Sequence, residues 1–240
     1  MGLDQQIASL SKIVTLSSIS LLLAISALSL IIKHPKAQVK KLLYLTIVVI
    51  TVSTTLFLAG STIFLNSISS SRGPVHHHAD FEIWACGQEH EIEQSKGLSN
   101  KVGTEAVHIH NDKRIHIEGV IVKPEDASLG NFFESIGGKL TQESISFPGH
   151  EGLETFKTGD SCESVKNAQV QVFVYKVKGQ YYEQSKITSP QNYIISAANN
   201  VPPGDCIIIE LDRQKARTDK LCQSFKVAQE TGKLKGELKY

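Results

Sequence analysis

Two long apolar runs dominate the first 71 residues of the chain, and neither contains a charged side chain. They cover residues 13–32 and 42–66. An α-helix rises about 1.5 Å per residue, so about 20 residues cross the ~30 Å hydrocarbon core of a bilayer. Each run therefore predicts a transmembrane helix. The serines of the first run are compatible with this interpretation because a serine hydroxyl can bond back to the helix backbone.

A short basic segment, residues 33–41, separates the two runs and predicts their orientation. It carries four lysines, whereas the outer flanks carry only Lys12 and Arg72. Cytoplasmic loops are enriched in Lys and Arg, so we expect this loop in the cytoplasm and the remainder of the chain outside it. The inverse orientation, with the large domain in the cytosol, is the alternative. A cleaved signal peptide has a basic start and a shorter apolar core, so both spans are expected to be retained.

Beyond residue 75 the apolar positions change to a period of two, which is typical of half-buried β-strands. Strands are predicted at 78–86, 106–110, 115–122, 170–177, 180–183, 193–197 and 206–211. One short helix is expected at 129–136, with Ser128 as its N-cap and Gly137 at its end. Gly, Pro and Asp signals predict loops over 139–168 and a turn at 199–205.

These patterns predict an α+β fold, in which two N-terminal transmembrane helices precede a mostly β extracytoplasmic domain with one short helix. The order of its elements is similar to that of a β-grasp sheet, an analogy that rests on element order alone. The expected segments are an outer N-terminal segment (1–12), transmembrane helix 1 (13–32), a basic cytoplasmic loop (33–41), transmembrane helix 2 (42–66), a linker (67–75), the extracytoplasmic domain (76–212) and a polar C-terminal tail (213–240).

Charge is concentrated in the second part of the chain. Residues 72–240 hold 20 of the 25 Lys and Arg residues and 23 of the 24 Asp and Glu residues. The formal net charge of the whole chain is +1, so a nucleic-acid partner is not expected. The basic loop at 33–41 is expected to touch anionic head groups of the lipid bilayer. A membrane or cell-surface protein is a further possible partner.

All four cysteines lie in the soluble part: Cys86, Cys162, Cys206 and Cys222. No Cys-x-x-Cys pair is present, which argues against a thioredoxin-type motif and a thiolate zinc knuckle. An even number of cysteines outside the cytoplasm predicts two disulfides, with three possible pairings. We favour Cys206–Cys222 with Cys86–Cys162, and four free buried thiols are the alternative.

Four segments of the soluble part carry a resemblance to other proteins. They read HHHADFEIWAC (76–86), HIHNDKRIHIE (108–118), LGNFFESIG (129–137) and PPGDCIIIE (202–210). Together they resemble a family of membrane-anchored exported proteins from uncultivated bacterial and archaeal lineages, for which no activity is assigned. The resemblance implies that the His-x-His segments and the Gly-Asp-Cys strand belong to one domain. It implies no chemistry, so the function must be argued from the candidate site.

Seven of the nine histidines fall between residues 76 and 116. Side chains at i and i+2 of a strand share one face, so His108 and His110 point the same way. A three-residue loop at 112–114 would place Asn111 opposite Ile115, His110 opposite His116 and His108 opposite Glu118. A two-residue loop would shift the register by one and break this grouping, whereas the apolar residues favour the first register.

The strand that contains His76, His78 and Asp80 repeats this arrangement, since these three residues share a face. Neutral imidazoles suit zinc, copper, nickel or iron, and carboxylates serve as further ligands or as hydrogen-bond partners of the imidazoles. The candidate metal ligands are therefore His76, His78, His108, His110 and His116, supported by Asp80 and Glu118. A hydrogen-bonded histidine network between strands and a solvated polar sheet face are the two alternatives.

The sequence carries no motif of an enzyme. It contains no Ser-His-Asp signature, phosphate loop or dinucleotide glycine fingerprint. We therefore predict a membrane-anchored domain that binds a transition metal, copper or zinc, for sensing, buffering or delivery. A non-catalytic adhesion or scaffold module with structural histidines is the alternative. A metal-dependent hydrolase or oxidase, in which the metal activates water, is the least favoured hypothesis.

Overall fold

The computed structural model describes residues 2–93, 100–162, 165–198 and 204–238. The chain divides into two compact units, residues 1–73 and 74–240. Most of the turn predicted at 199–205 lies outside the described residues.

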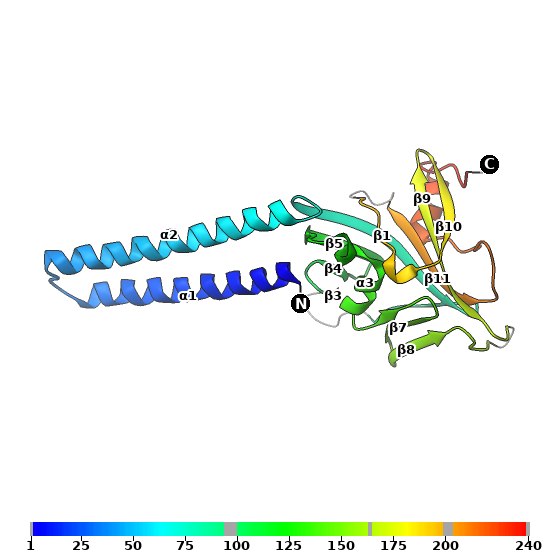
Figure 1. Cartoon of the computed structure of the whole chain (residues 1–240), viewed down its shortest axis with the longest axis horizontal. Coiled ribbons are helices and arrows are strands. Elements are labelled where there is room, and N and C mark those ends of the chain that lie inside the picture. The colour runs from blue at the N-terminus through cyan, green and yellow to red at the C-terminus, as the bar shows by residue number, and fades with distance from the viewer. Residues whose placement is uncertain (1, 94–99, 163–164, 199–203, 239–240) are drawn as a thin grey trace. The chain divides into compact units, whose positions relative to one another are not determined.

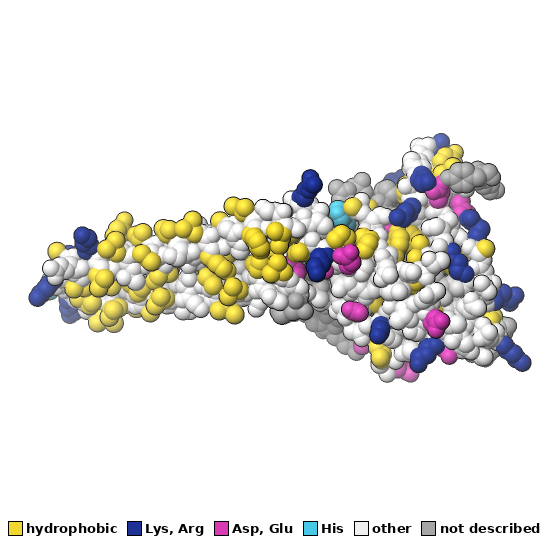
Figure 2. All heavy atoms as spheres, viewed as in Figure 1, with side chains coloured by type: hydrophobic (Ala, Val, Ile, Leu, Met, Phe, Trp, Pro, Cys, Tyr) yellow, Lys and Arg dark blue, Asp and Glu magenta, His cyan; other side chains and the backbone are white. Residues whose placement is uncertain are grey.

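The first unit is a hairpin of two antiparallel helices, α1 (Leu3–Ile31) and α2 (Ala37–Ile68) (Figure 1). Both are long and apolar enough to cross a membrane. Their large hydrophobic side chains remain exposed along the hairpin surface (Figure 2). Between the helices, the hydroxyls of Ser18 and Thr54 form a 2.7 Å hydrogen bond. Helix α1 begins ten residues before the apolar run, because residues 3–12 are helical as well.

The second unit is mostly β, with a large mixed sheet in the order β10-β9-β11-β1-β5-β4-β3 and β2 paired to β1 (Figure 1). Its strands are β1 (Pro74–Ala85), β2 (Gln88–His90), β3 (Val102–Gly103), β4 (Val107–Ile109), β5 (Arg114–Val120), β9 (Gln169–Lys178), β10 (Tyr181–Ile187) and β11 (Asp205–Asp212). A second sheet contains β6 (Lys139–Leu140), β7 (Ser144–Gly149) and β8 (Gly152–Lys157). The α+β class predicted from the sequence is confirmed.

Both faces of the large sheet are covered in its central part. One face packs against α3 (Leu129–Ser135) and the small sheet, with Phe132, Phe133 and Phe147 fully buried. The opposite face packs against α4 (Gln223–Glu230) through Phe225 and Ala228. This double cover explains why β1 buries residues of both alternating sets over 79–83.

Helix α3 begins at Leu129 as predicted and ends at Ser135, one residue earlier than predicted. The Ser128 hydroxyl accepts a hydrogen bond from the Asn131 amide, which satisfies one free N–H of the first turn. Gly137 follows the helix with φ of +86°, a left-handed conformation that favours glycine. Two short 3-10 turns, η1 (Pro124–Ala127) and η2 (Pro190–Asn192), contact this helix.

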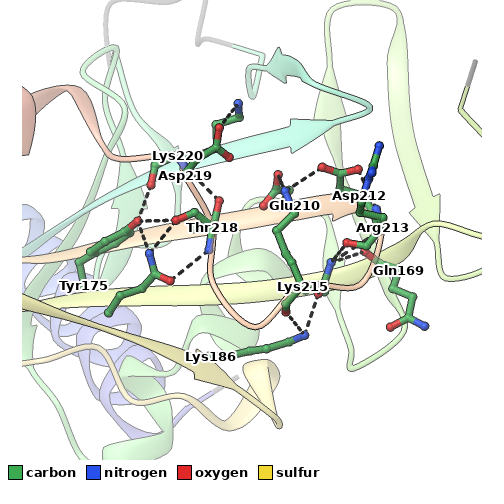
Figure 3. A network of polar contacts seen from close by, with 12 residues as sticks. Gln169, Tyr175, Lys186, Glu210, Asp212, Arg213, Lys215, Thr218, Asp219 and Lys220 are labelled. Atoms are coloured by element: carbon green, nitrogen blue, oxygen red, sulfur yellow. Dashed lines mark hydrogen bonds and ion pairs between the residues drawn. The ribbon is translucent and has the colours of Figure 1, made fainter. Parts of the chain in front are cut away.

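The polar tail predicted at 213–240 has a helix-permissive sequence, and its described residues, 213–238, contain α4 and pack across the sheet. Figure 3 shows the polar network that holds it. Lys215 Nζ contacts the buried Glu210 carboxylate at 2.8 Å, and the Tyr175 hydroxyl donates to the Lys220 carbonyl at 2.6 Å. The segment has few apolar residues and no clear apolar period. Phe225 is buried because it packs against the neighbouring face of the large sheet.

Two further expectations are corrected. Residues 139–168, predicted as loops, contain β6, β7 and β8, because Ile145 and Phe147 alternate inward despite the turn signals beside them. Residues 193–197, predicted as a strand, form a single bridge from Ile194 to Ser128. The Ser196 amide donates to the Asp205 carboxylate at 2.8 Å instead of joining a ladder.

The favoured cysteine pairing is confirmed, with disulfides Cys86–Cys162 and Cys206–Cys222. Their Cα atoms are 5.5 and 5.8 Å apart, which is the usual separation for a disulfide. The second bond joins β11 to the residue that precedes α4, so it fixes the helix against the sheet.

Burial of Tyr175 predicts a loss of stability in alkali. Burial raises the pKa of this tyrosine from 10.0 to about 12. As the pH rises, Tyr175 of the unfolded chain therefore loses its proton before Tyr175 of the folded chain does. The contribution of this hydroxyl to the free energy of unfolding is fully present below pH 10 and decreases as the pH rises toward 12. We expect the free energy of unfolding, followed by Trp84 fluorescence, to fall over this range in the wild type and less in Tyr175→Phe. An equal fall in both proteins would contradict this assignment.

Candidate functional site

Three adjacent strands, β1, β5 and β4, bring the predicted histidines to one sheet face. On one side of β5, His116 lies opposite His78 of β1, and Glu118 lies opposite His76. On the other side, His116 lies opposite His108 of β4. Directly paired residues point to the same face, so these side chains converge. We use the name histidine cluster for His76, His78, His108, His110 and His116.

The hairpin register differs from the expected one by two residues. Ile109, not Asn111, pairs with Ile115, and His108 pairs with His116 rather than with Glu118. A shift of two residues preserves the side-chain parity, so the histidines still share a face while the isoleucines enter the core. His110 lies just beyond β4, with its ring centroid 4.9 Å from those of His108 and His116.

His108 is the most deeply buried member of the cluster, with no exposed surface. Within the described part of the chain, neither of its ring nitrogens has a hydrogen-bond partner, and the nearest carboxylate oxygen, on Glu118, is 3.9 Å from Nε2. Burial, assisted by the nearby Lys101 charge, lowers the pKa of His108 to about 4. The imidazole is therefore neutral at physiological pH, which is the form that binds metal ions.

Strand β3 covers His108 at the sheet edge, where Gly103 is its pairing partner. A Cβ atom at Gly103 would lie 2.8 Å from the His108 Cα atom, and its φ is +122°. Glycine is therefore required at this close approach. The contact accounts for part of the burial of His108.

Fixed acceptors determine which nitrogen is left for a ligand in two other histidines. The Asp112 carboxylate accepts from His116 Nε2 at 3.0 Å, which leaves Nδ1 as the lone-pair nitrogen, and this atom is buried without a hydrogen-bond partner among the described residues. The Asn100 carbonyl accepts from His110 Nδ1 at 2.6 Å, which leaves Nε2. Such carboxylate and carbonyl partners orient the histidine ligands of metal sites. From the sequence alone, Asp112 is expected only as a residue of the hairpin loop.

The two predicted carboxylates have different environments. Glu118 lies within the cluster, where its Oε1 contacts His76 Nε2 at 3.0 Å. Asp80 is turned to other partners: Arg114 Nε donates to it at 2.7 Å, and the Ser224 hydroxyl of α4 donates to its other oxygen. Arg114 also contacts Asp112 at 3.6 Å. Asp80 therefore supports His116 through Arg114 and Asp112.

Two groups of three histidines are geometrically able to bind a metal ion: His76, His78 and His116, and His108, His110 and His116. In each group the ligand atoms lie within 4.8 Å of one another. Imidazole nitrogens lie about 2.1 Å from zinc, hence about 3.4 Å from one another around a tetrahedral centre. Side-chain rotations that move the nitrogen atoms by about an ångström would bring either group to the distances that an ion requires.

Histidines outside the cluster have other roles. His77 points to the opposite face of β1, where its partner in the register is Ile117. His90 lies on β2 and contacts Glu154 of β8 at 2.8 Å. This contact ties the large sheet to the small one.

No protein-family model, curated protein or solved structure matches this chain. The resemblance to membrane-anchored exported proteins therefore stays a prediction. The site itself has to carry the functional argument.

The Asp112 contact predicts the tautomer of His116. In the full-length protein labelled with ¹⁵N-histidine, at about pH 8 where imidazoles are neutral, we expect His116 to carry its proton on Nε2. Asp112→Ala removes the acceptor and should give a mixture of tautomers, whereas the control Glu151→Ala, in an exposed turn, should change nothing. An Nδ1-protonated His116 in the wild type would refute the proposed role of Asp112.

Proposed function

We propose that this chain is anchored in a membrane by α1 and α2 and that its histidine cluster binds a transition metal ion, copper or zinc, outside the cytoplasm. The burial of His108 carries the proposal. A buried polar group without a partner costs about 1–3 kcal/mol, and a metal ion is a partner that a neutral imidazole can bind. The surrounding histidines supply the further nitrogen ligands that such an ion requires.

Two independent features support an extracytoplasmic location of the domain. The basic loop between α1 and α2 favours a cytoplasmic hairpin turn. Both disulfides of the second unit are typical of an oxidising compartment. A metal-binding domain in that compartment suits the sensing, buffering or delivery of copper or zinc.

Removal of two cluster histidines should abolish metal retention. We expect the full-length protein in detergent to keep about one equivalent of copper or zinc after dialysis against metal-free buffer, as measured by elemental mass spectrometry. His108→Ala/His110→Ala should lose it, and the matched control His34→Ala/His150→Ala, outside the cluster, should keep it.

A folded wild type that takes up neither added copper nor added zinc would refute the proposal. Trp84 is the only tryptophan of the chain and lies in the second unit, so its fluorescence reports whether that unit is folded. The histidine face would then be a structural or partner-binding surface, as in an adhesion or scaffold module.

The orientation predicts where an impermeant reagent reacts. In intact cells, a membrane-impermeant maleimide should label Glu151→Cys, in the β7–β8 turn, and should label Ala37→Cys, at the start of α2, only after permeabilisation. The native cysteines are all disulfide-bonded and provide an unreactive background. Labelling with the opposite pattern would place the domain in the cytosol.

A further inference from the structure

The two metal-binding groups of the histidine cluster share one member, His116, and differ in the rest. His116 lies on the central strand of the three, directly opposite His78 on one side and His108 on the other. Among the described residues, neither group of ligand atoms that lie within 4.8 Å of one another contains both His78 and His108. With the side chains placed as they are, a single ion therefore binds His78 or His108 together with His116, but not both.

His116 has only one lone pair to offer. Its Nε2 proton is held by Asp112, which leaves Nδ1 as the single coordinating atom. A neutral imidazole binds one ion at a time, and a second ion would require removal of the Nε2 proton. The two positions therefore compete for the same ligand.

The two positions also differ in their access to solvent. The side chain of His76 is 58% exposed, whereas that of His108 is completely buried. An ion that arrives from solvent meets His76 first. An ion held by His108 is shielded from water and from competing ligands.

Glu118 lies between the two positions. Its Oε1 is 3.0 Å from Nε2 of His76 and 3.9 Å from Nε2 of His108. One carboxylate oxygen therefore neutralises part of the charge of the ion in either place. His116 and Glu118 together connect the exposed position to the buried one.

We propose that the histidine cluster holds one ion in two alternative positions and passes it between them on His116. The outer position (His76, His78, His116) captures the ion, and the inner position (His108, His110, His116) retains it. The ion moves inward when His108 and His110 replace His76 and His78, while the bond to His116 and the attraction of Glu118 persist. This inference rests on the proposed metal binding and adds a separation of capture from retention.

Kinetics of Zn²⁺ loading and release test this proposal in the full-length protein. The wild type should bind one equivalent. His76→Ala/His78→Ala should load at least about tenfold more slowly, with unchanged release into excess EDTA, since its inner position is intact. His108→Ala/His110→Ala should load at the wild-type rate and release at least about tenfold faster. His116→Ala should load zinc more slowly and release it faster than the wild type, because both positions use His116.

Two further variants guard against effects on folding. His76→Asn changes only an exposed side chain and should still slow loading. His77→Ala removes a neighbouring histidine of β1 that faces the other side, and it should leave both rates unchanged. Trp84 fluorescence identifies any variant that fails to fold.

Several outcomes would overturn the two-position arrangement without affecting metal binding itself. Tight uptake of two equivalents by the wild type would show two simultaneous sites with His116 as a bridge. Loading of both outer variants at the wild-type rate would show that the ion reaches the inner position directly. A wild type that binds no zinc or copper at all would instead refute the proposed function.

Discussion

The second unit depends on the pairing of strand β1 with different neighbours along its length. Residues 74–80 pair antiparallel with β5, and residues 79–85 pair parallel with β11. The second half carries Phe81 and Ile83 into the core. The first half extends beyond its pairing with β11. There His76 and His78 lie opposite Glu118 and His116 of β5. One strand thus builds both the core and the histidine cluster, and its register fixes the cluster relative to the core.

Polar side chains on the covered face of β1 are satisfied by the C-terminal segment. Asp80 and Glu82 are both less than a tenth exposed. Ser224 donates to Asp80, and the Gln223 amide donates to Glu82 at 3.0 Å. Burial raises the pKa of Glu82, and these contacts offset part of the cost of burying the carboxylates. The start of α4 therefore supplies hydrogen-bond donors for the buried carboxylates of β1, the strand that also carries His76 and His78.

Much of this architecture could be predicted because it repeats with a simple period. The apolar runs of α1 and α2, the alternation in β1 and β9, and the cap at Ser128 are local patterns. The common face of the histidines also followed from alternation, since an error of two residues in the hairpin register left their parity unchanged. The β-grasp analogy rested on element order and stays a prediction.

The remaining features depend on contacts that no local pattern encodes. Phe225 is buried only because the sheet and the Cys206–Cys222 bond lie against α4. Asp112 looked like a turn residue, and its importance appears only once the turn is folded so that its carboxylate meets His116. Burial of Ile145 and Phe147 was obscured by the Pro148-Gly149 pair beside them. In each case tertiary packing overrides the local signal.

The Cys206–Cys222 bond has a consequence for the orientation of His116. Cys222 precedes α4 directly, and Ser224 of that helix begins the chain of contacts through Asp80, Arg114 and Asp112 to His116. Reduction of this bond removes the covalent constraint on the helix. The orientation of His116 is thereby linked, through four side chains, to the oxidation state of a cysteine pair.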